Sequence, residues 1–477
     1  MKVTHVSLRP TEAAQTHNVP ALTPELLAAT AARYSRNNEG LTAILDKIDP
    51  NHPDKSVDAI FRMVDYGHQS IADMVPIAMF MDTISIWLVY YMWTICPTAG
   101  GQESSTRYLK LSADGLPAAA ELGIPAHLQN DWAGANTAGF AAYQSALQLW
   151  GEIAEQHPEM MGIPPALLSD PAEAAVKKVA RLRRNYAFDR ARYFLPVGAT
   201  TNCMMIMSAR GWVTLCQHLL SHPLPEPRAL GEQIKKQLAL SAPRMLKHAG
   251  YTEAHCQINA ADFHKLVDQA NQPRGPITAE HEMPIKPRLQ TLLPPELDPR
   301  PTPSQIGADA QFAADLAMHH NRYAPTGKSL QRTSVRFSWP AVSFAEIRDL
   351  NRHRTGTKHS PQIPQGFYFA LDQLPPGNNS YRARLLAIAQ TGVQATNQAL
   401  RLLREADPTY IYWTLLGTAY PFEHTTTADK FLYEAELRTG LGAHYRYARH
   451  LRDVLALWYT EFPATKGLVL EGSAEPE

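Results

Sequence analysis

Apolar residues recur along much of this chain at the spacing typical of helices, interrupted by short stretches typical of strands. The clearest helical stretches are residues 128–156 and 381–406, where apolar side chains return every three to four positions. Strand-like stretches occupy residues 75–81 and 334–340. The pattern predicts an α+β fold in which long helices pack on small antiparallel sheets.

One apolar run, residues 75–96, is long enough to raise the question of a membrane span. It is interrupted by Asp82, Thr83 and Ser85. A charge at the centre of a spanning helix costs about 2.5–3.5 kcal/mol. We therefore expect a buried strand at Ile77–Met81, a turn, and a buried helix from about Ser85, with a membrane span as the minor alternative.

The order of these elements repeats along the chain, which predicts a tandem duplication; chance likeness of two α+β units is the alternative. In each half a strand leads into a helix and a polar cluster, and a long helical stretch follows. A step into proline comes next, at Leu195-Pro196 and at Tyr420-Pro421, and then another helix. A proline-dense stretch suits a semi-rigid linker between the halves. The predicted boundaries are a first unit at 1–265, a linker at 266–305, a second unit at 306–465 and a flexible acidic tail at 466–477.

The charge balance limits the classes of partner. The 477 residues carry 45 Lys and Arg against 45 Asp and Glu, so no broad field attracts nucleic acid or an acidic membrane. An anion site must therefore be local. The four cysteines show no CxxC pairing, which is typical of reduced thiols in a cytoplasmic protein, and no metal site is predicted. The N-terminus lacks a signal peptide's apolar stretch.

A local basic cluster follows one well-signalled helix. The sequence SFAE at 343–346 predicts a capping box at the start of a helix. Phe344, Ile347 and Leu350 form the apolar stripe of that helix. The stretch NRHRTGTKHSPQ comes directly afterwards, at 351–362. Basic groups at a helix C-terminus suit the helix dipole, which explains one such residue better than three. Two arginine forks around a histidine suit an anion that carries a flat ring.

These residues resemble the signature of the flavin-dependent thymidylate synthases, with its two halves in different parts of the chain. RHRTGTKHS is similar to the first half of that signature. GQESSTRYLKL, at 101–111, is similar to the second half, and YGHQSIAD, at 66–73, resembles a further segment of the family. The resemblance implies that FAD is bound by Arg352, His353, Arg354, Thr355, His68 and Ser70. It implies that the nucleotide is bound by Glu103, Ser104, Ser105, Thr106 and Arg107, with Ser105 also catalytic.

Two downstream segments extend the resemblance, and each half of the chain contains one of them. DRARYFLP, at 189–196, places Arg192 on an arginine that reaches the nucleotide. FLYEAELRTG, at 431–440, places Arg438 on an arginine that contacts and polarises the pyrimidine. Arg210 matches an arginine near the flavin. Because each half of the chain keeps what the other lacks, and the family builds its site between protomers, we expect one composite site.

The resemblance implies an enzyme that transfers a one-carbon unit to C5 of a dUMP-like pyrimidine deoxynucleotide. FAD would be the cofactor, NADPH and 5,10-methylenetetrahydrofolate the co-substrates, and the assembly a homodimer that mimics a tetramer. Asp349 stands where the family has glutamine. A carboxylate facing a uracil edge or a phosphate is unfavourable, so either Asp349 turns away or the ligand differs. The alternatives are a flavin enzyme with another acceptor and a non-catalytic nucleotide-binding protein.

Overall fold

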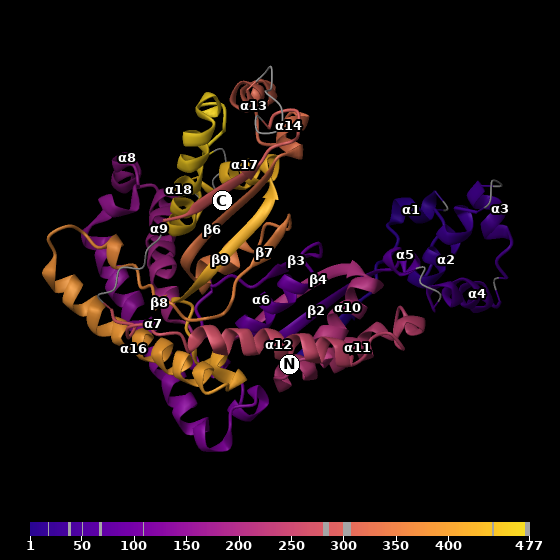
Figure 1. Ribbon diagram of the computed structural model, residues 1–477, viewed down its shortest axis with the longest axis horizontal. Helices are drawn as coiled ribbons and strands as arrows, with labels where there is room; N and C mark the ends of the chain where they lie inside the picture. The colour runs from indigo at the N-terminus through magenta and orange to yellow at the C-terminus, as the bar shows by residue number, and fades with distance from the viewer. Residues whose placement is uncertain are drawn as a thin grey trace. The chain divides into compact units, whose positions relative to one another are not determined.

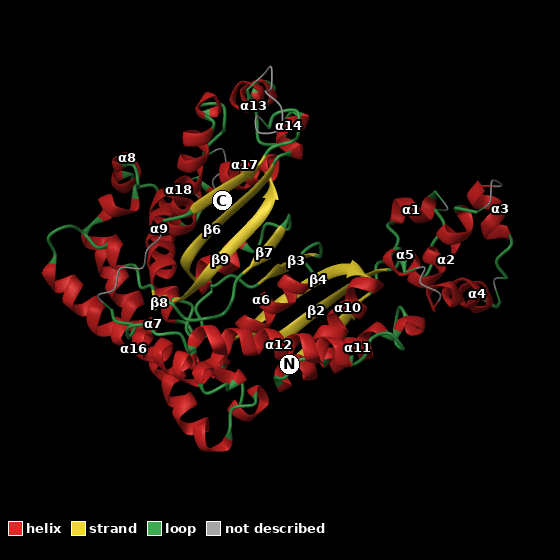
Figure 2. Ribbon diagram, viewed as in Figure 1, coloured by secondary structure: helices red, strands yellow, loops and turns green. Residues whose placement is uncertain are grey.

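The computed structural model confirms an α+β fold with two antiparallel sheets in tandem (Figures 1 and 2). It describes residues 1–17, 19–36, 40–49, 51–65, 69–107, 109–279, 286–298, 307–440 and 443–472. No helix within these residues combines the length and the apolar character needed to cross a bilayer.

The chain forms two compact units, and each unit combines segments that are not contiguous in the sequence. The first unit contains residues 1–105, 113–132 and 198–265, and the second contains residues 106–112, 133–197 and 266–477. The division differs from the prediction in the middle of the first repeat, because two of its segments pack with the second repeat.

The first unit is built on a four-stranded sheet in the order β1-β2-β4-β3. β2 pairs antiparallel with β4 from Pro76 to Ser85, with a bulge between Met81 and Ile84. The turn predicted there is therefore wrong, because the chain bulges and then returns to the ladder. The strands are β1 (Lys2–Val6), β2 (Pro76–Ser85), β3 (Gly100–Glu103) and β4 (Thr200–Ser208).

Helices cover this sheet and form a separate group near the N-terminus. The helix predicted from about Ser85 is confirmed: Ser85 is the N-cap of α6, and its hydroxyl accepts from the backbone N–H of Leu88 at 3.0 Å. The helices of this unit are α1 (Glu12–Thr16), α2 (Pro24–Tyr34), α3 (Gly40–Asp46), α4 (Pro53–Asp65), α5 (Ser70–Asp73), α6 (Ile86–Ile95), α10 (Ala209–Leu220), α11 (Pro225–Leu238) and the greater part of α12 (Glu253–Ala270).

The second unit repeats the sheet in the order β5-β6-β9-β7, with β8 also paired to β9. β6 carries a bulge between Trp339 and Val342, at the position that corresponds to the bulge in β2. The shared strand order and the shared bulge support the tandem duplication. The strands are β5 (Arg288–Leu292), β6 (Ser334–Ser343), β7 (Thr357–His359), β8 (Gly366–Phe367) and β9 (Thr418–Thr427).

Long helices flank the second sheet, as the apolar pattern predicted. The helices expected at 128–156 and 381–406 are α7 and α16, and Arg384 of α16 donates to Glu152 of α7 at 2.6 Å. The helices of this unit are most of α7 (Gln129–Gln156), α8 (Pro165–Ser169), α9 (Glu173–Ala191), α13 (Ala308–Leu316), α14 (Lys328–Arg332), α15 (Phe344–Leu350), α16 (Asn379–Arg404), α17 (Ala428–Arg438) and α18 (Tyr445–Glu461).

A short antiparallel pairing joins segments of the two repeats inside the second unit. Pro196 is paired with Leu415, the N–H of Val197 donates to Thr414, and the N–H of Leu416 donates to Leu195. The segment of the second repeat that corresponds to Leu195-Pro196 therefore lies near Leu415. The predicted equivalence with Tyr420-Pro421 is wrong, because those residues lie inside β9.

Two further stretches differ from the sequence-based boundaries. β5 lies within the stretch predicted as a linker, where its backbone pairs antiparallel with β6. In the stretch predicted as a tail, the N–H of Leu470 donates to Glu436 at 2.9 Å and that of Gly472 donates to Thr439 at 2.8 Å. Residues 466–472 therefore contact α17, while residues 473–477 lie outside the described chain.

We expect Gly392→Ala, in the middle of α16, to destabilise the protein. A Cβ there would lie 2.1 Å from two ring carbons of the buried Phe367. Overpacking of this kind costs about 1–3 kcal/mol. The matched control is Gly151→Ala in α7, where nothing lies within 4 Å and alanine is the better helix former. Thermal unfolding of both variants checks this: equal midpoints would contradict the expected crowding.

Candidate functional site

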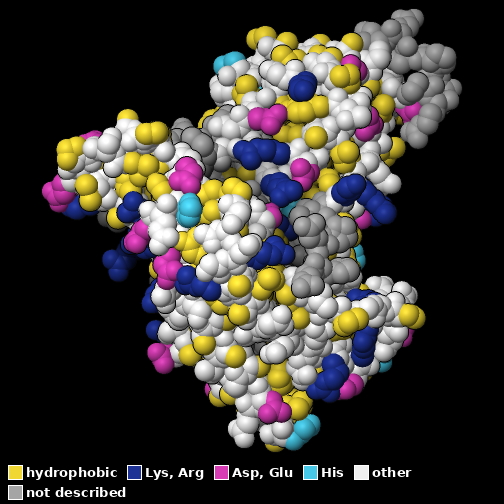
Figure 3. All heavy atoms as spheres, turned by 90° about the vertical axis from the view of Figure 1, so that its left-hand side faces the viewer, with side chains coloured by type: hydrophobic (Ala, Val, Ile, Leu, Met, Phe, Trp, Pro, Cys, Tyr) yellow, Lys and Arg dark blue, Asp and Glu magenta, His cyan; other side chains and the backbone are white. Residues whose placement is uncertain are grey.

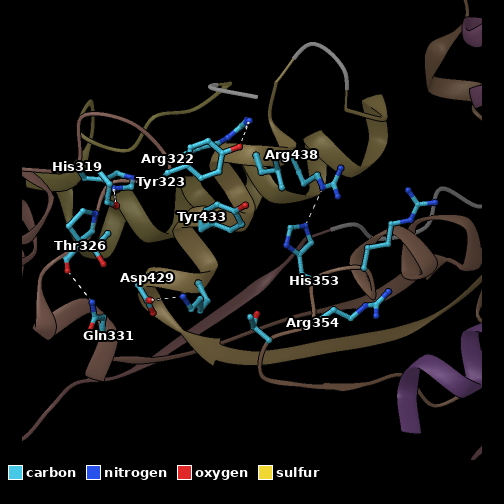
Figure 4. Close-up of a pocket in the computed structure, with 16 residues that line it drawn as sticks. His319, Arg322, Tyr323, Thr326, Gln331, His353, Arg354, Asp429, Tyr433 and Arg438 are labelled. Atoms are coloured by element: carbon cyan, nitrogen blue, oxygen red, sulfur yellow. Dashed lines mark hydrogen bonds and ion pairs between the residues drawn. The ribbon is translucent and has the colours of Figure 1, made fainter. Parts of the chain in front are cut away.

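A cavity of about 580 Å³ lies in the second unit and contains the basic cluster that the sequence singled out. Arg352, His353, Arg354 and Thr355 line it from the loop after α15, and Arg438 lines it from the end of α17 (Figure 4). The volume falls within the usual range of small-molecule sites. Its lining contains five basic side chains, Arg322, Arg352, Arg354, Lys430 and Arg438, and one carboxylate, that of Asp429.

Helix α15 positions this loop by burying its apolar stripe. Phe344, Ile347 and Leu350 are fully buried, as predicted. The predicted capping box is wrong in its bonding. Ser343 is the N-cap without a side-chain cap bond, and its hydroxyl instead donates to the carboxylate of Glu346 at 2.5 Å. Glu346 is fully buried and faces Arg446, at 3.6 Å, so its carboxylate serves an internal charge network rather than the helix end.

Backbone contacts fix the loop after the helix. Gly356 has a φ of 65°, and a Cβ there would lie 2.0 Å from the carbonyl oxygen of Thr425 in β9. The loop therefore requires glycine at that point. Lys358 folds back to donate to the carbonyl oxygens of His353 and Thr355, the latter at 3.1 Å. Burial lowers the pKa of Lys358 to about 8.

His353 and Arg438 meet directly. The Nε of Arg438 donates to Nε2 of His353 at 3.2 Å (Figure 4), so that ring nitrogen acts as an acceptor. Burial lowers the pKa of His353 to about 4, which keeps the ring neutral at pH 7. Behind it lies Glu434, which accepts from Tyr447 at 3.0 Å. Burial acts to raise the pKa of Glu434, but His353 and other basic groups nearby lower it to about 2.

A second charged cluster in the same unit contains both arginines that the first repeat was expected to supply. Arg107 donates to both carboxylate oxygens of Asp189, at 2.7 and 3.2 Å. Arg192 is buried and donates to Asp349 at 2.7 Å. Asp349 also lies 3.6 Å from Nε of Arg352. Asp349 therefore connects this cluster to the cavity.

The structure places Ser70, Glu103, Ser104, Ser105 and Arg210 in the first unit. Ser70 begins α5, and Arg210 donates to Asp73 of that helix at 2.9 Å. Glu103 ends β3, and Ser104 and Ser105 follow it. Thr106 is buried and begins the segment that belongs to the second unit. His68 and Tyr108 lie outside the described residues.

Several lining residues were missed in the sequence. They come from the segment between α13 and α14 and from α17: His319, Arg322, Tyr323, Lys430 and Tyr433. His319 is held by Glu436 at 2.9 Å and by the carbonyl oxygen of Ala324 at 2.9 Å. The guanidinium of Arg322 lies 4.9 Å from the ring of Tyr323. The run HHNRY at 319–323 was a usable signal, because it is basic and aromatic in a short loop.

Charges elsewhere do not form a broad single-sign field on the face that Figure 3 shows. Lys and Arg side chains gather near the middle of that face but are interspersed with Asp and Glu. The described residues contain no group of three or more His, Cys, Asp or Glu side chains arranged to hold a metal ion. The local cavity is therefore the site with the clearest chemical character.

Comparisons with known proteins found a family model, a curated protein and a solved structure that are similar to this chain. The model of the Thy1 family, described as thymidylate synthase complementing protein, matches residues 19–244. UPF0159 protein Ta1429 of Thermoplasma acidophilum is 22% identical over 480 residues, which cover 92% of this chain and 94% of that protein. The UMP/dUMP methylase PolB from Streptomyces cacaoi, solved with 5-Br dUMP, aligns over 52% of this chain and 93% of its own, with 16% identity and a TM-score of 0.31.

The low pKa of His353 predicts a specific loss of stability in acid. The unfolded chain binds a proton near pH 6.5, but the folded chain binds it only near pH 4. Stability from this residue is therefore present above pH 6.5 and is lost as the pH falls toward 4. At pH 5 the free energy of unfolding contributed by this residue is about 2 kcal/mol lower than above pH 6.5. His353→Gln should lose less stability than the wild type between pH 7 and pH 5 in urea unfolding; parallel losses would contradict this.

Proposed function

We propose that this chain, whose residues 19–244 match the model of the thymidylate synthase complementing proteins, is an FAD-dependent enzyme of that type. Its reaction would transfer a one-carbon unit from 5,10-methylenetetrahydrofolate to C5 of a pyrimidine deoxynucleotide, with NADPH as the reductant. The observation that carries the proposal is the basic cavity that joins Arg352, His353 and Arg354 to Arg438.

The cavity fits a flavin nucleotide in its chemistry. A flavin carries a flat ring and phosphate groups, and the lining offers aromatic side chains at Tyr323 and Tyr433 beside its five basic groups. Arg352, Arg354 and Arg438 are the residues we propose to hold it, since guanidinium groups bind phosphates and the carbonyl edges of rings. When bound, FAD supplies the hydride chemistry that the protein side chains lack.

The side chains of this site would orient the bound ring and polarise its carbonyl group. Arg438 is directed by its hydrogen bond to neutral His353, and its other N–H groups, which have no hydrogen-bond partner among the described residues, would serve a ring carbonyl. A fixed cation at that point stabilises negative charge as it develops on the ring during attack from C5. His353 acts here by position, because its low pKa leaves it without a proton to give at neutral pH.

The composite arrangement is supported by the way the chain folds. Arg107 and Arg192 come from the first repeat, and the loop with Arg352 comes from the second. All three lie in one compact unit, and Asp349 links Arg192 to Arg352. This is the geometry expected if one chain completes a site that other members of the family build from two.

Flavin binding tests the cavity. We expect the wild type to bind FAD with a yellow absorbance, and Arg438→Gln to weaken FAD or pyrimidine binding by about tenfold or more, the worth of one charge-assisted hydrogen bond. The matched control is Arg401→Gln, whose arginine donates to Gln398 and Glu405 on the exposed side of α16. A wild type that binds no flavin on titration would contradict the proposal.

A double-mutant cycle tests whether the site is composite. Arg107→Ala and Arg352→Ala should each reduce turnover, measured as release of the C5 proton from dUMP. Because both residues would serve one site, their losses should be less than additive when combined, with a coupling of about 0.5–3 kcal/mol. Additive losses would instead indicate that the two repeats act independently.

A further inference from the structure

One wall of the cavity is formed by the segment between α13 and α14, which none of the sequence motifs contains. This wall contributes six residues to the lining: His319, Arg322, Tyr323, Ala324, Pro325 and Thr326. The other lining residues come mainly from α17 and from the loop after α15. In the view of Figure 4, Arg322 and Tyr323 lie between His319 and Arg438. The placement of the wall against α17 therefore sets the shape of the cavity.

His319 ties this wall to α17. The residue borders the cavity, yet its side chain is almost fully buried. Its Nε2 lies 2.9 and 3.1 Å from the two carboxylate oxygens of Glu436, and its Nδ1 lies 2.9 Å from the carbonyl oxygen of Ala324. Glu436 is fully buried on α17, two residues before Arg438, and also accepts from the N–H of Leu470 at 2.9 Å. One ring therefore connects the wall to the helix that carries Arg438.

Both partners of the His319 ring accept hydrogen bonds, because a carbonyl oxygen and an ionised carboxylate have no proton to donate. A neutral imidazole has a single N–H, so its other nitrogen would direct a lone pair at one of these oxygens. Both ring nitrogens therefore carry protons, and His319 forms a buried ion pair with Glu436. Separating such a pair would leave an uncompensated buried charge, so the pair fixes the wall in one arrangement.

The first unit has no carboxylate at the position that corresponds to Glu436. Thr427 and Ser208 are the N-caps of α17 and α10 at the ends of equivalent strands, so Glu436 corresponds to Gln217. Gln217 donates to the carbonyl oxygen of His248 at 3.0 Å and lines a cavity of about 110 Å³. The carboxylate thus occurs in the unit with the large cavity, which favours a role in shaping that cavity over a general role in the fold.

The wall offers two kinds of group that suit a nucleotide. Nη2 of Arg322 donates to the hydroxyl of Tyr323 at 2.9 Å, and the guanidinium lies 4.9 Å from the centre of that ring. Tyr323 is 73% exposed, so its ring is open to a ligand. A guanidinium binds phosphate, and an exposed aromatic ring stacks on a flat one. A ligand with both groups would therefore contact the wall as well as Arg438.

We propose that His319 is a positioning residue of the candidate site, which through its pair with Glu436 holds the wall so that Arg322 and Tyr323 reach the ligand. His319 acts through these two residues and not by touching the ligand. The inference rests on the proposed function in so far as the ligand is FAD. It adds to the site a wall that lies outside the family motifs.

The test removes the pair without leaving a buried charge. His319→Leu combined with Glu436→Met replaces both members by apolar side chains of similar size, an exchange that proteins often tolerate, so the thermal midpoint should stay near that of the wild type. Calorimetric titrations of the full-length protein should show FAD and inorganic pyrophosphate binding about tenfold more weakly, the value of one charge-assisted contact. The matched control, His157→Leu with Glu159→Met, removes another histidine–carboxylate pair and should leave both affinities unchanged. Unchanged affinities in the folded His319 variant would overturn the inference.

Two further variants separate positioning from a general effect on the fold or the charge. In Glu436→Gln a neutral His319 can still donate from Nδ1 and accept at Nε2 from the new amide, so the wall stays tied and both affinities should be retained. A loss as large as that of the apolar double variant would overturn the inference. Arg322→Gln should weaken both ligands by a similar factor, and adding it to the apolar double variant should cause no further loss, because that contact is already gone. Additive losses, about a hundredfold together, would show that His319 does not act through the wall.

The two proposals fail in different ways. If the wild type binds FAD but the variants contradict these expectations, only the role of His319 is lost. If the wild type binds pyrophosphate and no FAD, the proposed function is lost, and the pyrophosphate titrations still decide the role of His319. If it binds neither, both proposals are lost.

Discussion

The pairing of residues 193–197 with residues 414–417 is the constraint on which the candidate site depends. The N–H groups of Leu416 and Gly417 donate to Leu195 and Tyr193 at 2.8 and 2.7 Å, and the N–H of Val197 donates to Thr414 at 3.1 Å. These residues are almost wholly buried, so backbone groups here must pair with one another. The pairing brings Arg192, which directly precedes it, into the same unit as α15.

Once Arg192 is buried there, the charges around it follow. A buried guanidinium needs a counter-ion, and Asp349 supplies it from a position fixed by the apolar stripe of α15. The same helix ends at the loop that lines the cavity, so the buried cluster and the open cavity share one rigid support. The helix α15 therefore joins an internal ion pair to a loop that lines the cavity.

The cavity itself depends on a different set of contacts. Gly356 lets the loop pass close to β9, Lys358 ties the loop back on itself, and Glu434 lies beneath His353. Burial lowers the pKa of His353 to about 4 and so keeps it neutral, and its ring accepts a hydrogen bond from Nε of Arg438. The basic character of the cavity comes from arginines whose charge does not depend on pH, while the histidine between them contributes direction and shape.

Much of this could be predicted from the sequence, because the signals are local. The apolar period defined α7 and α16, Ser85 marked the start of α6, and the run at 351–355 marked the cavity. The repeated order of elements predicted two similar sheets. The family resemblance was likewise carried by short motifs, each readable without knowledge of its neighbours.

What the tertiary structure decided is long-range. Residues 106–112 and 133–197 pack with the second repeat, since backbone pairing between distant segments leaves no periodic trace in either one. The hydrogen bond from Ser343 to Glu346 replaced the predicted capping box, because the carboxylate of Glu346 is fully buried and needs donors. The direction of Asp349 was open in the sequence, and its meeting with Arg192, 157 positions away, depends on the folded chain alone.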